Sequence, residues 1–103
     1  MPSKGRLRLV ERLKTRKGRL REGLVLVEGI RAVSEVLSSG AEIRFGLRSS
    51  RLQDSAVGRV LTESLADRGV DTADIDDSEL SELADTKNAQ GVLLVCEEPE
   101  LDL

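Results

Sequence analysis

The hydrophobic pattern of the chain is dominated by two short aliphatic runs, residues 24–27 (LVLV) and residues 92–96 (VLLVC). Each run is too short for a helix and is apolar at every position, which is typical of a strand covered on both faces. We therefore expect the first run to be an inner strand and the second to be a central strand next to it.

The residues after the first run have the pattern of a turn and a covering helix. Gly29 allows a tight turn out of the strand, and Ile30, Val33 and Leu37 then recur at helical spacing. Gly40 is placed to end this helix as a left-handed cap. Together these residues predict the first half of a strand–helix–strand unit.

The rest of the chain continues the alternation of strand and helix patterns. A helix capped by Ser3 is expected from about residue 4 to 15, another from Asp54 or Ser55 to Gly69, and a brief one after the acidic residues 76–77. Parallel neighbouring strands need crossover helices. The sequence therefore predicts the α/β class, with one mostly parallel four-stranded sheet between two helical layers and strands at 24–28, 43–47, 70–75 and 92–97.

Size and composition limit the setting of the protein. The 103 residues suit a single domain, and no apolar run approaches the roughly 20 residues of a membrane span. Cys96 is the only cysteine, so an internal disulfide is impossible and a cytoplasmic location is expected. Because it lies within the second aliphatic run, we expect Cys96 to pack in the core. The N-terminus lacks the pattern of a signal peptide.

Charge is strongly segregated along the chain. Residues 1–22 hold nine basic and two acidic side chains, whereas the remainder holds 7 basic and 17 acidic ones. A basic segment on an acidic body is typical of a protein that binds a polyanion at one end. Arg8 and Arg12 face away from the apolar stripe of the first helix, and Gly18 and Gly23 bracket a predicted mobile loop. A solvated helix face with a flexible basic loop is the plainer interpretation.

The residue types that are missing exclude several kinds of chemistry. The chain has no histidine, tyrosine or tryptophan, which excludes histidine-based catalysis and histidine-ligated zinc. Residues 48–51 (RSSR) could bind phosphate, although a polar loop is the favoured interpretation, and the acidic residues 76–77 favour helix capping over a metal site. We therefore expect a binding domain without a metal or a membrane segment.

With these elements in place, three stretches of the chain carry a family resemblance. They are residues 16–23 (RKGRLREG), 24–31 (LVLVEGIR) and 81–95 (SELADTKNAQGVLLV). In order and spacing they resemble the N-terminal substrate-binding domain of the SpoU, or TrmH-like, RNA ribose 2′-O-methyltransferases. One departure is Ala89, where the family usually has proline.

The resemblance implies an αβα fold similar to small ribosomal and kink-turn-binding proteins. It implies that residues 1–98 form an RNA substrate-binding domain of an rRNA or tRNA methyltransferase, with a basic helix and loop at 1–23. Residues 99–103 would then begin a linker to a catalytic domain that is absent from this chain. We expect this chain alone to be non-catalytic and to hold no cofactor, with S-adenosylmethionine bound by the missing domain.

The resemblance also implies which residues form the site. The expected RNA contacts are cationic and come from Arg8, Arg12, Arg16, Lys17, Arg19 and Arg21. The expected loop-shaping residues nearby are Glu28, Gly29, Thr86 and Gly91, for which a purely structural role is equally open. The alternative function is a protein-interaction or dimerisation module that uses the basic N-terminal segment, and a homodimeric parent protein stays open.

Overall fold

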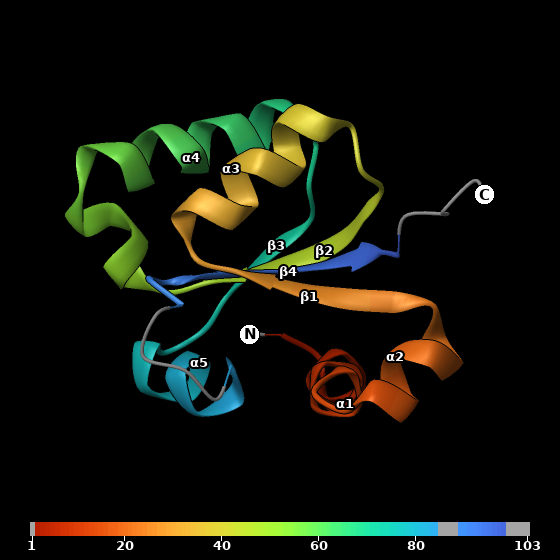
Figure 1. Cartoon of the computed structure of the whole chain (residues 1–103). Coiled ribbons are helices and arrows are strands. Elements are labelled where there is room, and N and C mark those ends of the chain that lie inside the picture. The colour runs from red at the N-terminus through yellow and green to blue at the C-terminus, as the bar shows by residue number, and fades with distance from the viewer. Residues whose placement is uncertain (1, 85–88, 99–103) are drawn as a thin grey trace.

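The computed structural model describes residues 2–84 and 89–98, which form a four-stranded sheet with helices on both faces (Figure 1). Thr86 and the predicted linker start at 99–103 lie outside the described residues. In chain order the elements are α1 (Lys4–Leu13), α2 (Arg16–Glu22), β1 (Leu24–Glu28), α3 (Ile30–Ser39), β2 (Ile43–Arg48), a 3-10 helix η1 (Ser50–Asp54), α4 (Ala56–Asp67), β3 (Thr72–Asp74), α5 (Asp77–Ala84) and β4 (Val92–Glu97).

The molecule has three layers, as the sequence predicts. Helices α3 and α4 cover one face of the sheet, and α1, α2 and α5 lie on the other side (Figure 1). Successive side chains of β4 point to opposite faces. Leu93 and Val95 therefore enter the core on the α1–α5 side, whereas Val92, Leu94 and Cys96 enter the core under α3 and α4. The predicted core position of Cys96 is thus confirmed, and it explains why this run is apolar throughout.

The sheet is mixed, so the expectation of a mostly parallel sheet is wrong. The strand order is β1-β4-β2-β3, and β4 runs antiparallel to both of its neighbours, while β2 and β3 are parallel. The cause lies in the path of the chain through α5. The N–H of Ser49, just after β2, donates to the carbonyl of Gly91, just before β4, at 2.9 Å. The chain therefore enters β4 at the end of the sheet where β2 finishes.

The positions of the two aliphatic strands within the sheet also differ in part from expectation. β4 is central and pairs with β1, as predicted, but β1 is an edge strand and not an inner one. The side chains of β1 are apolar at successive positions because helices cover both faces of the strand. Whether a strand has hydrogen-bonded neighbours on both sides leaves no trace in that pattern.

A register shift changes the direction of side chains along β2. Ile43, Phe45 and Leu47 alternate in the sequence, a pattern that predicts one shared face in a regular strand. The pairing of β2 with β4 shifts between Ile43 and Phe45. As a result Phe45 and Leu47 pack on the α1–α5 side, while Ile43 packs on the opposite side.

Candidate nucleic-acid interface

The basic segment predicted to be a mobile loop is the helix α2, and this corrects the expectation. Thr15 caps its start by accepting a hydrogen bond from the N–H of Gly18 at 3.0 Å, and Gly23 ends it with a φ of 67°. Gly18 lies against α1 so closely that a Cβ there would come within 1.8 Å of the Arg12 carbonyl oxygen. In the sequence the two glycines indicate a loop, but in the structure Gly18 permits helix packing and Gly23 caps the helix.

The inner side of α2 is used to hold the helix against α1. The Nη1 atom of Arg19 donates to the carbonyl of Leu13 at 3.0 Å. The Nε atom of Arg12 forms an ion pair with Glu22 at 3.3 Å. Two of the predicted RNA-binding cations, Arg12 and Arg19, therefore contribute to the local structure.

The outer side of α2 carries cations around an exposed leucine, and we call this set the α2 cationic face: Arg16, Lys17, Leu20 and Arg21. At 100° per residue these four positions fall within one arc of the helix. All four are exposed, and Leu20 keeps 66% of its surface in solvent. Within the described part of the chain, its three cations make no ion pair, so their charge is available to a ligand.

Arg8 lies away from the α2 cationic face, in a groove between α1 and α5. The groove is lined by Arg8 and Arg12 from α1 together with Glu79 and Glu82 from α5. Carboxylates on one wall reduce the positive potential that Arg8 offers to a polyanion. Of the six predicted RNA contacts, the structure therefore brings Arg16, Lys17 and Arg21 together on one exposed surface.

Three of the predicted loop-shaping residues, Glu28, Gly29 and Gly91, lie at the opposite end of β1. The N–H of Gly29 donates to the Val92 carbonyl at 3.2 Å, which ties the end of β1 to the start of β4. Gly91 has a φ of 83° and lies in contact with η1. Because α2 precedes β1 and Glu28 ends it, the whole strand separates the two groups (Figure 1).

Sequence reasoning missed Gln90 at this end of the sheet. Gly29 precedes α3 without a side chain that could cap it, and the Oε1 atom of Gln90 accepts from the N–H of Ile30 at 2.9 Å. Gln90 itself adopts a φ of 55°. The sequence does show that no capping residue precedes Ile30. The residue that caps the helix, Gln90, is 60 residues away along the chain, so the sequence does not identify it.

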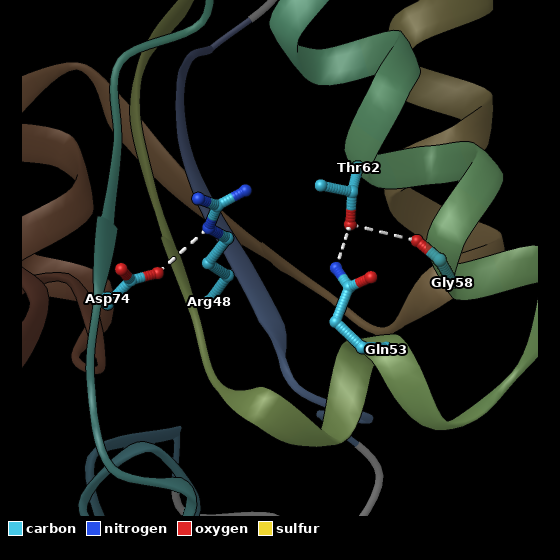
Figure 2. Close-up of polar contacts among 5 residues, drawn as sticks. All are labelled: Arg48, Gln53, Gly58, Thr62 and Asp74. Atoms are coloured by element: carbon cyan, nitrogen blue, oxygen red, sulfur yellow. Dashed lines mark hydrogen bonds and ion pairs between the residues drawn. The ribbon is translucent and has the colours of Figure 1, made fainter.

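Residues 48–51 span the end of β2 and the start of η1 and do not form a plain loop, and Arg48 and Ser49 are engaged within the protein. Arg48 points to Asp74, with 2.9 Å between its Nε and a carboxylate oxygen, while Gln53 donates to Thr62 at 2.7 Å (Figure 2). Ser49 is buried and donates to Asp77 at 2.7 Å. The hollow beside these residues is lined by more acidic than basic side chains, namely Asp74, Asp76, Asp77 and Glu79 against Lys4 and Arg48. A phosphate would be repelled there.

Residues 2–84 and 89–98, which the structure describes, offer neither a metal site nor a membrane span. No group of three or more cysteine, aspartate or glutamate side chains in that part of the chain could hold a metal ion. Among the same residues, no helix combines the length and the apolar character needed to cross a membrane.

Cys96 yields a prediction about pH. Burial raises the pKa of its thiol from 9.0 to about 11, so folding favours the protonated thiol. This contribution to stability is complete below pH 9 and is lost as the pH rises to about 11. We expect the wild type to lose free energy of unfolding relative to a Cys96→Val variant over this interval. Urea titrations of both proteins across the interval test this, and a constant difference would contradict it.

Comparisons with known proteins identify the family and agree with the fold. The model of the MRM3-like substrate binding domain matches residues 4–94. Solved structures of similar fold are the SpoU methyltransferase AviRb from Streptomyces viridochromogenes with AdoMet (24% identity, TM-score 0.72), an RNA 2′-O ribose methyltransferase (22%, 0.81) and an AdoMet-bound rRNA methyltransferase from Sinorhizobium meliloti (16%, 0.72).

These similarities cover nearly all of this chain but only part of the larger proteins. The chain is covered to 95%, 98% and 98%, whereas it spans 34%, 37% and 37% of the three solved chains, in the same order. No curated protein matches the chain. The family model extends from α1 into β4 and thus includes both the α2 cationic face and the Gln90 turn. The chain therefore belongs to the MRM3-like substrate binding domain family, the substrate-binding domain of SpoU-type RNA methyltransferases.

Proposed function

We propose that this domain binds the RNA substrate, an rRNA or a tRNA, of a ribose 2′-O-methyltransferase. The observation that carries the proposal is the α2 cationic face, where Arg16, Lys17 and Arg21 are exposed and form no ion pair within the described residues. Unpaired, exposed cations on a short rigid element suit phosphate contacts, which supply most of the affinity of proteins for nucleic acids. Arg8 and Arg12 on α1 lie beside carboxylates and contribute less to this positive surface.

The domain is proposed to recognise RNA by phosphate charge and shape and not by base stacking. Phe45 is the only aromatic residue of the chain, and it keeps only 4% of its surface exposed. The Arg6 guanidinium lies 4.7 Å from the centre of its ring and covers it further. Stacking platforms for bases need exposed rings, so affinity should depend mainly on electrostatics.

The methyl transfer itself is assigned to a separate catalytic domain of the parent protein. The similar AviRb structure holds AdoMet in a chain of which this domain spans 34%. We assign no residue of the present domain to that cofactor, and its own task is to hold and position RNA. A cytoplasmic location, expected from the single unpaired cysteine, belongs to the same proposal.

A salt titration tests the proposal directly. If four to six of the basic side chains between Lys4 and Arg21 contact phosphates, the logarithm of RNA affinity should fall with the logarithm of salt concentration at a slope of roughly −3 to −5. Fluorescence anisotropy with a labelled structured RNA measures this slope. A poly-glutamate chain of similar charge density is the control, because a general acidic-partner module would bind both polymers alike. Tight binding of poly-glutamate, or no RNA binding at low salt, would contradict the proposal.

A further inference from the structure

β1 presents an open edge of the sheet. In an antiparallel pair, residues alternate between those whose N–H and C=O groups face the neighbouring strand and those whose groups face away. The hydrogen bonds from Gly29 to Val92 and from Glu98 to Gly23, at 3.2 and 3.0 Å, fix this alternation for β1. The backbone groups of Leu24 and Leu26 therefore point away from β4.

β4 is the one neighbour of β1 in the sheet formed by the described residues. Figure 1 shows β1, in orange, along one margin of the sheet. The pairing of β1 with β4 runs without a register shift along all five residues of the strand. The outward backbone groups of Leu24 and Leu26 thus form a regular, extended edge.

The other edge strand, β3, has the usual protection against pairing, whereas β1 lacks it. β3 is 3 residues long, ends in Asp74 and follows Asp71, and both aspartates are ion-paired. Short, charged edges resist pairing with a further strand. In contrast, β1 is 5 residues long and its first four residues are aliphatic. It has no proline, bulge or lysine.

We propose that β1 pairs with β1 of a second copy of the chain, in antiparallel orientation across a two-fold axis. An axis at Leu26 places this residue opposite Leu26 of the partner subunit, so that outward-facing backbone groups meet outward-facing groups in both copies. Edge pairing of this kind gives affinity through main-chain hydrogen bonds. The two sheets would become one continuous sheet.

The distribution of charge favours a second copy in this orientation. α2, at the start of β1, has four cationic residues and one acidic residue (RKGRLRE). The other end of β1 carries Glu28 and, in α3, the ion pair of Arg31 with Glu35 at 3.7 Å. Antiparallel pairing places the basic α2 of one copy near the less basic end of the other. Parallel pairing would place two basic α2 helices side by side, where they would repel each other.

Two measurements test the proposal on the unmodified chain. The paired interface is small, so a weak dimer is expected, visible by sedimentation at about 1 mM and dissociated at about 10 μM. Amide hydrogen exchange should slow at Leu26 as concentration rises, while Val25 and Val27, bonded to β4, stay protected throughout. A monomer at all concentrations, or a Leu26 amide whose exchange does not depend on concentration, would overturn the proposal. An edge that binds another protein instead, or that the chain itself covers, would also give a Leu26 amide whose exchange does not depend on concentration.

A pair of proline variants separates the two sheet edges. Leu26→Pro removes an outward N–H of β1 without breaking a hydrogen bond to β4. Thr72→Pro removes an outward N–H of β3 without breaking a hydrogen bond to β2. We expect Leu26→Pro to reduce the association constant at least tenfold and Thr72→Pro to leave it unchanged. Thermal unfolding confirms that each variant is folded. A folded Leu26→Pro variant that dimerises as well as the wild type would refute the pairing through β1.

Discussion

Replacing Arg16, Lys17 and Arg21 together by glutamate should abolish most RNA binding at low salt. Charge-assisted hydrogen bonds contribute roughly 1.5 kcal/mol or more each, so the loss of three weakens binding by more than about 100-fold. Arg19 is left in place because its Nη1 atom holds the carbonyl of Leu13. Anisotropy titrations at about 50 mM salt measure the loss, since phosphate contacts contribute most there.

A charge-matched control decides whether the effect is local. Arg31, Arg44 and Arg51 are exposed, lie outside α1 and α2, and make no side-chain hydrogen bond to a backbone carbonyl among the described residues. Changing them to glutamate alters the net charge by the same amount, and we expect a loss of less than about tenfold from long-range electrostatics. Both triple variants should unfold within a few degrees of the wild type, because exposed charges contribute little to stability. If the control loses binding and the α2 variant keeps it, the interface lies at the other end of the molecule.

Gly91→Ala should be the most destabilising single methyl addition at the Gln90 turn, costing about 3 kcal/mol. Two effects add: the φ of 83° is unfavourable for a residue with a Cβ, and that Cβ would lie 2.5 Å from the backbone nitrogen of Leu52. A domain of this size should lose about 12–24 °C in melting temperature for such a change. Circular dichroism melts measure it.

Gly40→Ala separates the two effects. Gly40 has a similar φ of 76°, but nothing lies within 4 Å of the position that its Cβ would occupy. We expect it to cost about 1 kcal/mol, which is the backbone penalty alone. Equal losses in the two variants would show that the contact between Gly91 and η1 adjusts without cost.

Local chemistry made much of the secondary structure predictable. Ser3 accepts a hydrogen bond from the N–H of Arg6, and Ser55 accepts one from the N–H of Gly58, so both caps lie where the sequence indicated. Gly40 ends α3 in the left-handed conformation, as predicted. These features depend on residues within one helical turn, and such neighbours are visible in the sequence.

The candidate site was predictable in composition but not in shape. The cluster of cations at 16–21 is evident from the sequence, whereas its folding as a helix depends on Gly18 fitting against the Arg12 carbonyl. The same contact fixes which side of α2 faces α1. Arg19 therefore points inward, whereas Arg16 and Lys17 are exposed. Exposure could not be assigned before the packing of α2 on α1 was known.

By itself the sequence determined the alternation of strands and helices, the buried position of Cys96 and the family to which the chain belongs, because each depends on residue types and their spacing along the chain. The tertiary structure alone decided the direction of β4, the edge position of β1 and the distance between the basic helix and Gly91. These depend on which end of the sheet the chain enters after α5. Hydrogen bonds such as Ser49 to Gly91, at 2.9 Å, join residues far apart in the chain, and hydrophobic periodicity carries no information about such partners.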